Sequence, residues 1–221
     1  MISIVIPAYN EENYIEKTLK SIENQPYKDY ETIVVANGCT DNTVEIARRY
    51  PCKIIELNEP NVSKARNAGA QAASNNILLF IDADTRLSND TLSKISAEFK
   101  QPNAVATTLW EPNHAYARYR LAFSLRNLIL KMHLYHGSAA GTIITWKDSF
   151  LKAGGFDSER NVSETKQLID KLIQNGSYKV INTSVTVSTR RFEKWGIFSL
   201  CFFWIKQRVT GTKKLEYEAI R

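Results

Sequence analysis

Cysteine is scarce in this 221-residue chain, which has only Cys39, Cys52 and Cys201. Their number and spacing fit neither a disulfide framework nor a cysteine-based metal site, so we expect reduced thiols in a cytoplasmic protein. No uninterrupted apolar run approaches the roughly 18 residues that a membrane-spanning helix needs. The first residues carry no basic leader ahead of their apolar run, so we expect no signal peptide. Nothing resembles a known nucleic-acid-binding module, and nucleic acid is not an expected partner.

Positive charge is concentrated in the second half of the sequence. From His114 onward there are 18 Lys and Arg against 8 Asp and Glu, and the residues before it hold 11 against 15, which gives the net charge of +6. A basic half indicates an anionic partner, such as a phosphorylated ligand or an acidic membrane surface. A solvated basic face gives the same composition, so both interpretations stay open.

Apolar runs alternate with segments of helical periodicity in the first hundred residues. Runs that are apolar throughout and joined by helices predict a mostly parallel sheet with helices on both faces, which is a Rossmann-like α/β fold. Such a sheet binds its ligand beyond the carboxyl ends of the strands. Asn10 is expected to cap the first helix. The four predicted strands lie at residues 2–9, 30–36, 52–57 and 76–82.

Two carboxylates follow the fourth apolar run directly. Asp82 and Asp84 are two positions apart, and side chains at that spacing on an extended chain point the same way. Like charges so close together call for a cation, and carboxylate oxygens without nearby His or Cys favour Mg²⁺ or Mn²⁺. Such a metal completes its shell with ligand phosphates and water. The sequence therefore predicts a divalent cation at Asp82 and Asp84 and a diphosphate on the ligand.

Five short motifs in the chain resemble, in order and spacing, those of the family 2 glycosyltransferases. They are "IVIPAYNEE" at 4–12, "NGCTDNT" at 37–43, "ARNAG" at 65–69, "DADT" at 82–85 and "GGFD" at 154–157. The resemblance implies the GT-A fold, a nucleotide-sugar donor, a divalent metal and, for the usual inverting type, transfer of a sugar to an acceptor hydroxyl. The implied acceptor is a sugar, a lipid or a polysaccharide precursor.

The resemblance also implies which residues bind the donor. In the family the segment after the first strand and its first acidic residue, here Glu11, hold the nucleoside. The family usually has two acidic residues where this chain has Ala36 and Asn37, which leaves the nucleobase open, although the Asn37 amide can bond a base edge. Two arginines after the last strand resemble a pattern in which basic side chains reach the diphosphate. The implied donor-binding residues are Pro7, Ala8, Tyr9, Glu11, Asn37, Lys64, Arg66, Asn67, Asp82, Ala83, Asp84, Arg190 and Arg191.

The catalytic base is left open by the sequence. In the family it is commonly the Asp of a Glu-Asp pair after "GGFD", and this chain has Glu164 and Thr165 there. Glu164 is one candidate base, and Asp157 is a weaker one. A retaining mechanism without a protein base is the second interpretation. The third is a donor-binding or regulatory protein with little turnover.

The second half of the chain is expected to face the acceptor. We expect a GT-A domain over residues 1–190, with a donor half at 1–113 and an acceptor half at 114–190, followed by a basic, aromatic helical extension at 191–221. Apolar residues with basic flanks in that extension are typical of an interfacial helix, so peripheral contact with the inner face of the cell membrane is predicted, with a packed helix as the alternative.

A long helix is expected over residues 114–137. Leu121, Leu125, Leu128 and Met132 lie on one of its faces, opposite a second apolar face. A helix that is apolar on two faces must meet two partners. One is expected to be the sheet, and the other a second subunit in a homodimer, the C-terminal segment or a membrane surface.

Overall fold

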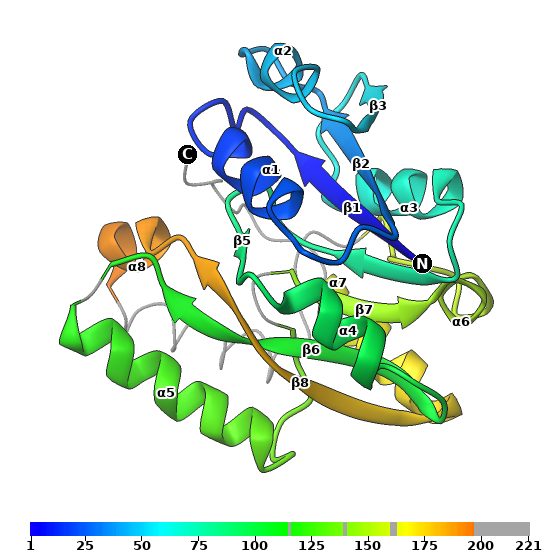
Figure 1. Ribbon diagram of the computed structural model, residues 1–221, viewed down its shortest axis with the longest axis vertical. Coiled ribbons are helices and arrows are strands. Elements are labelled where there is room, and N and C mark those ends of the chain that lie inside the picture. The colour runs from blue at the N-terminus through cyan, green and yellow to red at the C-terminus, as the bar shows by residue number, and fades with distance from the viewer. Residues whose placement is uncertain (115, 139–140, 160–162, 197–221) are drawn as a thin grey trace.

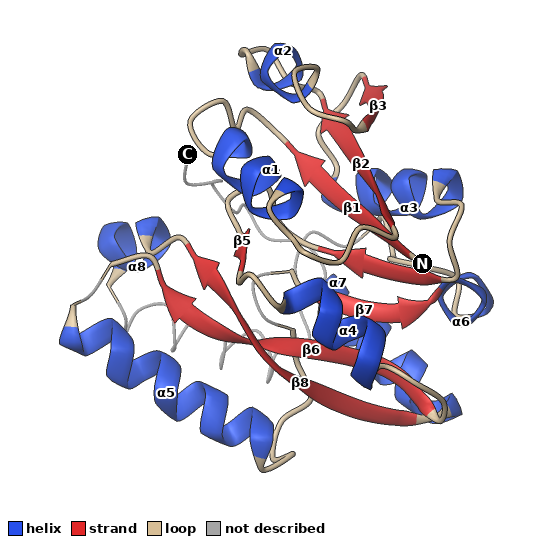
Figure 2. Ribbon diagram, in the orientation of Figure 1, coloured by secondary structure: helices blue, strands red, loops and turns tan. Residues whose placement is uncertain are grey.

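An eight-stranded sheet forms the centre of the protein (Figures 1 and 2). The computed structural model describes residues 1–114, 116–138, 141–159 and 163–196. In spatial order the strands are β3 (Lys53–Leu57), β2 (Tyr30–Asn37), β1 (Ile2–Ala8), β4 (Ile77–Phe80), β7 (Ile143–Trp146), β6 (Asn103–Pro112), β8 (Ser177–Val187) and β5 (Arg86–Leu87).

The first half of the sheet is parallel and the second half is mixed. β1 pairs in parallel with β2 and β4, and β2 pairs in parallel with β3. β7 then runs antiparallel to both β4 and β6, while β6 and β8 are parallel to each other. Since β7 is antiparallel to both of its neighbours, β4 and β6 run in the same direction. The carboxyl ends of five strands therefore lie at one edge of the sheet: β1, β2, β4, β6 and β8. The predicted α/β fold is confirmed, with β7 and the short β5 as its antiparallel members.

Helices cover both faces of the sheet, as predicted. On one face, Ile4 and Ile6 of β1 share a buried cluster with Leu19, Ile95 and Phe123 from three helices. This face carries α1 (Ile15–Glu23), α2 (Thr43–Ala47), α4 (Thr91–Glu98) and α5 (Ala117–Lys131). The opposite face carries α3 (Val62–Ala72), α6 (Lys147–Lys152) and α7 (Glu164–Leu172), which runs into a 3-10 turn at Ile173–Asn175.

Close packing of α3 on the sheet depends on Gly69. A Cβ atom at Gly69 would lie only 2.3 Å from Cγ1 of Val5 on β1. All seven residues of β1 are buried, because helices lie on both sides of that strand. This double burial explains why the strand is apolar at every position except Ser3 rather than alternating.

Two predicted helix boundaries are wrong. The first helix begins at Ile15, and Asn10 does not cap it. Asn10 instead adopts a left-handed backbone with φ of 53°, and its side-chain oxygen accepts the Thr40 N–H at 2.8 Å. The long helix spans Ala117–Lys131, and the backbone turns left-handed at His133 with φ of 55°.

The last described helix is α8 (Arg190–Trp195), directly after β8. Residues 197–221, which hold most of the predicted extension, lie outside the described residues. The division into domain halves and extension therefore stays a prediction. Within the described ranges, no helix is both long enough and apolar enough to cross a membrane.

Candidate functional site

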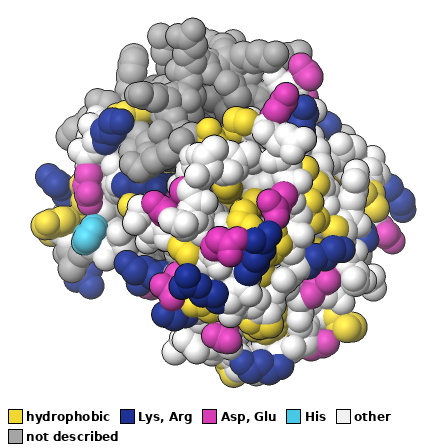
Figure 3. All heavy atoms as spheres, turned by 90° about the horizontal axis from the view of Figure 1, so that it is seen from above, with side chains coloured by type: hydrophobic (Ala, Val, Ile, Leu, Met, Phe, Trp, Pro, Cys, Tyr) yellow, Lys and Arg dark blue, Asp and Glu magenta, His cyan; other side chains and the backbone are white. Residues whose placement is uncertain are grey.

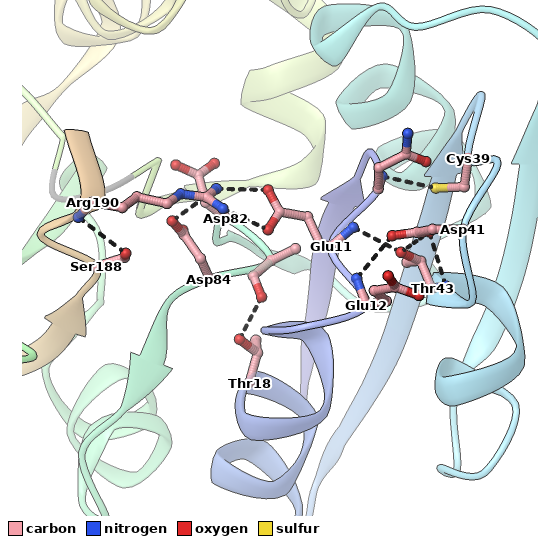
Figure 4. Close-up of polar contacts among 12 residues, drawn as sticks. Glu11, Glu12, Thr18, Cys39, Asp41, Thr43, Asp82, Asp84, Ser188 and Arg190 are labelled. Atoms are coloured by element: carbon pink, nitrogen blue, oxygen red, sulfur yellow. Dashed lines mark hydrogen bonds and ion pairs between the residues drawn. The ribbon is translucent and has the colours of Figure 1, made fainter. Parts of the chain in front are cut away.

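Loops from β1 and β2 are bonded to each other at the carboxyl edge of the sheet (Figure 4). The backbone N–H of Glu11 donates to Thr43 Oγ1 at 2.7 Å, and that of Glu12 donates to Asp41 Oδ2 at 3.1 Å. Burial alone raises the pKa of Asp41, but hydrogen bonds from Thr43 and from the Glu12 backbone outweigh it and lower the pKa. The two loops that the sequence predicts to hold the nucleoside thus form one connected wall.

Arg190 enters this edge from the start of α8. Its Nη1 and Nη2 donate to Glu11 at 3.1 and 2.7 Å, and Nη2 lies 3.1 Å from Asp84 Oδ2. The side chains of Arg190, Glu11 and Asp84 are 13%, 14% and 16% exposed, and Figure 4 shows them meeting. Burial lowers the pKa of Arg190, but the Glu11 and Asp84 carboxylates outweigh burial and raise it. Arg190 is therefore a fixed cation against the second carboxylate of the acidic pair.

Arg66 forms a second cluster with the first carboxylate of the pair. Its Nη2 donates to Asp82 Oδ1 at 2.9 Å and its Nη1 donates to Glu164 Oε1 at 3.0 Å. The Arg66 side chain is only 5% exposed. Burial lowers the pKa of Arg66, yet Asp82 and Glu164 raise it by more. Arg66, expected to contact the donor, thus joins the predicted metal ligand to the predicted base.

The acidic pair has the chemistry of a divalent cation site. Asp82 and Asp84 supply hard oxygen atoms, and each already faces a cationic group, Arg66 and Arg190 respectively. In the described part of the chain, no group of three or more His, Cys, Asp or Glu side chains is arranged to hold a metal by itself. The residues therefore fit a Mg²⁺ or Mn²⁺ ion that takes one or two protein carboxylates and obtains its other ligands from a bound diphosphate and water.

The predicted nucleoside segment lies beside these clusters. Pro7 and Ala8 are buried at the end of β1, which continues one residue past the proline, and Tyr9 follows half-buried. Asn37 ends β2 and is 4% exposed. Its Oδ1 accepts the Asn61 N–H at 2.7 Å, so the amide oxygen holds the loop that leads into α3.

Two predicted donor contacts are engaged within the fold. Asn67 Nδ2 donates to the Phe156 carbonyl at 2.9 Å, and Asn67 Oδ1 accepts the Phe156 N–H at 2.9 Å. This pairing ties the "ARNAG" and "GGFD" motifs together. The Ala83 carbonyl accepts a hydrogen bond from Thr18 Oγ1 at 2.7 Å, which fixes the backbone between the two aspartates. Lys64, in contrast, is exposed in the first turn of α3.

The two candidate bases lie in different surroundings. Glu164 is the first residue of α7 and accepts a hydrogen bond from Thr165 Oγ1 at 3.3 Å in addition to that from Arg66. Asp157 lies in the turn after β7 and α6, where its Oδ1 accepts the Glu159 N–H at 3.0 Å. Arg66 thus brings Glu164 into the Asp82 cluster. Arg191 is the second residue of α8, and its side chain is not among those described.

Sequence reasoning missed two residues of the site. The Arg190 guanidinium carbon lies 4.6 Å from the centre of the Tyr14 ring, a cation–π contact. Gly141 has φ of 69°, and a Cβ atom there would lie 2.3 Å from Asp82 Oδ1. Tyr14 follows the acidic pair of the first motif, which is a weak signal. Gly141 gives no signal beyond that of a turn, because its closeness to Asp82 arises from the pairing of β7 with β4.

A mixed α/β sheet with two arginine–carboxylate clusters at its carboxyl edge has its charged side chains where sheets of this kind bind their ligands. Comparison with known proteins gives its family. The family described as glycosyl transferase family 2 matches residues 3–146, and the chain belongs to this family.

Similar proteins include much larger glycosyltransferases. Glycosyltransferase GlyA of Streptococcus pneumoniae is 37% identical over 112 residues, which are 47% of this chain and 16% of that protein. The poly(ribitol-phosphate) β-N-acetylglucosaminyltransferase TarS of Staphylococcus aureus is 32% identical over 103 residues, which are 43% of this chain and 18% of that protein. The chain thus matches less than a fifth of the length of these two relatives.

Two solved structures confirm the GT-A fold. A mannosyltransferase from Pyrobaculum calidifontis, in complex with GDP-Man and Mn²⁺, has a TM-score of 0.73 at 18% identity and covers 96% of this chain and 65% of its own. S. aureus TarS 1–349 in complex with UDP-GlcNAc has a TM-score of 0.69 at 21% identity, with 86% and 58% covered.

Proposed function

We propose that this chain transfers a sugar from a nucleoside-diphosphate sugar to an acceptor hydroxyl. Family membership and the GT-A fold support this activity. The observation that carries it is the meeting of Asp84, Glu11 and Arg190 at the carboxyl edge of the sheet. Carboxylates suited to a divalent cation and a guanidinium suited to phosphate lie there within one ion-pair cluster.

Arg190 is proposed to exchange partners when the donor binds. Its guanidinium pairs with both Glu11 and Asp84 in the structure. A planar guanidinium binds a phosphate in the same two-bond manner as a carboxylate. Arg190 would then hold the diphosphate, and Asp84 would be free to bind the cation together with Asp82, which stays beside Arg66. A bound Mg²⁺ or Mn²⁺ supplies stabilisation of the charge that develops on the leaving diphosphate.

Glu164 is proposed as the general base. The acceptor oxygen attacks the anomeric carbon, the bond from that carbon to the diphosphate breaks with its electron pair on the diphosphate, and the acceptor proton goes to a carboxylate. Arg66 links Glu164 to Asp82. This link supports the proposal that Glu164 lies close to the reacting groups. Asp157 is proposed to act in structure or acceptor contact, since it bonds the turn after "GGFD".

A donor-binding protein with little turnover is the second candidate. It is favoured by Thr165 at the position of the family's usual acid and by the involvement of Glu164 in an ion pair with Arg66. A retaining enzyme without a protein base accounts for the same two features. The anomeric configuration of the product separates the inverting from the retaining reaction.

The acceptor is proposed to be a sugar, a lipid or a polysaccharide precursor in contact with a membrane. TarS is named as acting on poly(ribitol-phosphate), an anionic polymer, and the basic second half of this chain suits an anionic acceptor. Contact of the C-terminal segment with a membrane stays a prediction, since residues 197–221 lie outside the described residues.

The test is a thermal-shift and transfer screen with Mn²⁺ across uridine and guanosine diphosphates and their sugars. One donor is expected to raise the melting temperature only when Mn²⁺ is present, because a ligand that binds the folded state stabilises it. Release of free nucleoside diphosphate and labelling of an acceptor then report turnover. Mn²⁺-dependent binding without turnover on a broad acceptor panel would favour the donor-binding candidate.

A further inference from the structure

Among the described residues, the buried contacts of helix α5 lie on one of its faces. Tyr119, Phe123 and Leu130 on its inner face are at most 2% exposed, and Phe123 packs edge-on against Trp110 with 5.1 Å between ring centres. Asn127 fixes the same face by exchanging two hydrogen bonds with the Trp110 backbone, at 3.0 and 2.9 Å. The contacts of the inner face therefore attach α5 to the sheet, and none of these contacts involves the opposite face.

The outer face of α5 is apolar and open. Leu121, Leu125, Leu128 and Met132 are 73%, 58%, 52% and 58% exposed. They recur at intervals of four, three and four residues, which places them in one stripe along the helix. Of the eight large hydrophobic side chains exposed in the described part of the chain, six lie between Tyr116 and Leu134. Such a concentration marks an interaction surface rather than scattered surface residues.

The charge on this helix and on the segments that flank it in the sequence has one sign. Residues 112–147 contain no Asp or Glu, and Arg118, Arg120 and Lys131 of α5 are exposed. Elsewhere the signs are mixed: Figure 3 shows acidic and basic side chains interspersed over the described part of the face seen from above. Figure 1 shows α5 at the outside of the molecule, beyond β6 and β8. An apolar stripe with only basic charges on its helix is typical of helices that lie in a membrane interface.

We propose that the outer face of α5 binds the surface of an anionic lipid bilayer. The stripe enters the headgroup region, and Arg118, Arg120 and Lys131 bind the anionic headgroups on either side. This surface does not include the residues of the donor crevice, so the proposal stands apart from the proposed function.

Charge argues against the other two occupants. A second copy of α5 would place the same three cations opposite one another without an acidic residue from 112–147 to pair them. One 15-residue helix also offers far less than the roughly 800 Å² per partner of a stable interface. The chain's own residues 197–221 hold five Lys or Arg against two Glu, so their charge does not complement that of α5 either.

Flotation of the full chain with phosphatidylglycerol–phosphatidylcholine vesicles tests the proposal, with pure phosphatidylcholine vesicles alongside. We expect flotation with the anionic vesicles only. The L121S/L125S/L128S variant should bind at least about tenfold more weakly, and so should R118Q/R120Q/K131Q. Leu151→Ser is the matched control, because Leu151 is 48% exposed on α6 at the other face of the sheet, and it should float like the wild type.

Four outcomes would overturn the proposal. The first two are a wild-type chain that stays entirely in the soluble fraction and a triple-serine variant that floats like the wild type. The third is flotation that is lost only in the Phe202→Ser/Phe203→Ser variant of the C-terminal segment. The fourth is a wild-type chain that is a dimer while the triple-serine variant is a monomer. Far-ultraviolet circular dichroism and the melting temperature of each variant establish that it is folded. Nucleotide binding by the vesicle-deficient variants should equal that of the wild type, since the crevice is unchanged.

Discussion

Arg190 and Glu11 form an ion pair with two hydrogen bonds, at 3.1 and 2.7 Å, although 179 positions separate them in the sequence. The pair joins the loop after β1 to the start of α8. The same guanidinium lies 3.1 Å from Asp84 Oδ2. In the proposed function a diphosphate would therefore compete with the two carboxylates for Arg190, and a metal ion would compete with Arg190 for Asp84.

Replacing Arg190 should change nucleotide and metal affinity in opposite directions. Arg190→Gln is expected to weaken Mn²⁺-dependent binding of a nucleoside diphosphate by roughly 10- to 100-fold, because it removes charge-assisted hydrogen bonds worth about 1.5–3 kcal/mol. It should tighten binding of Mn²⁺ alone, because Glu11 and Asp84 lose a competing cation. Calorimetry measures the first constant and electron paramagnetic resonance of free Mn²⁺ the second. Arg190→Lys keeps the charge but not the planar guanidinium, so its affinities should lie between those of the wild type and Arg190→Gln. If neither variant changes the Mn²⁺ affinity, Arg190 and Mn²⁺ do not compete for Asp84.

Loss of the proposed base should affect turnover rather than donor binding. Glu164→Gln is expected to lower kcat by roughly 10²- to 10⁴-fold, the range for removal of a general base, with little change in the KM for the donor. Asp157→Asn serves as the control and should retain most of the activity. Steady-state kinetics with the donor found in the screen give both constants.

Placing the family's usual Asp at position 165 tests whether Glu164 is the base or whether Thr165 limits turnover. If turnover is low because Thr165 replaces a catalytic Asp, Thr165→Asp should raise kcat. If Glu164 is the base, Thr165→Asp should leave kcat the same or lower it, because a second negative charge enters beside Glu164. We expect the latter result, and a clear rise in kcat would transfer the role of base away from Glu164.

The Asp41 carboxylate should stabilise the fold in a pH-dependent way. Its pKa is lowered in the folded protein, so its contribution is present above the pKa of the unfolded chain and is lost as the pH falls through the folded pKa. Asp41→Asn is expected to lower the free energy of unfolding by about 1 kcal/mol at pH 7, allowing for solvent screening, and by much less at pH 3. Urea unfolding at both pH values measures this. Asp29→Asn, at a side chain 54% exposed, is the control; an Asp41→Asn effect equal at both pH values counts against the assignment.

Replacing Gly141 should displace Asp82 in addition to straining the backbone. Gly141→Ala puts a Cβ atom 2.3 Å from Asp82 Oδ1, so the carboxylate must move, and Mn²⁺-dependent nucleotide binding should weaken by about tenfold or more. Gly154→Ala is the matched control, because Gly154 has a similar φ of 79° with no atom within 4 Å of the added Cβ. It should cost only the left-handed backbone strain of about 1–2 kcal/mol. Equal nucleotide affinity in the two variants would show that Asp82 does not require the glycine.

Much of the donor half could be predicted because its signals are local. The run Ile77–Phe80 is apolar because β4 is buried on both faces, and the two aspartates follow it directly. Motif order alone indicated the family that the comparison confirms. The helix start at Asn10 was mispredicted because Asn10 bonds Thr40 in the neighbouring loop, a tertiary contact that overrides the local capping preference.

The partners of the site residues could not be predicted from the sequence. Arg66 and Glu164 are 98 positions apart, and Asn67 and Phe156 are 89 apart. Their contacts depend on how α3, α7 and the turn before α7 pack on one face of the sheet. The sequence therefore indicated which residues are unusual, while only the fold decides that Asn67 bonds the "GGFD" backbone and that an arginine pairs with each aspartate of the acidic pair.

The most direct measurement is calorimetric titration of uridine and guanosine diphosphate into the wild-type chain, with Mn²⁺ or with EDTA, and into Asp84→Asn. We predict that at least one of the two nucleotides binds in Mn²⁺, and that EDTA or Asp84→Asn weakens this binding at least about tenfold. Absence of binding by either nucleotide, or equal affinity in Mn²⁺, in EDTA and in the Asp84→Asn variant, would contradict a cation-dependent diphosphate site at the end of β4.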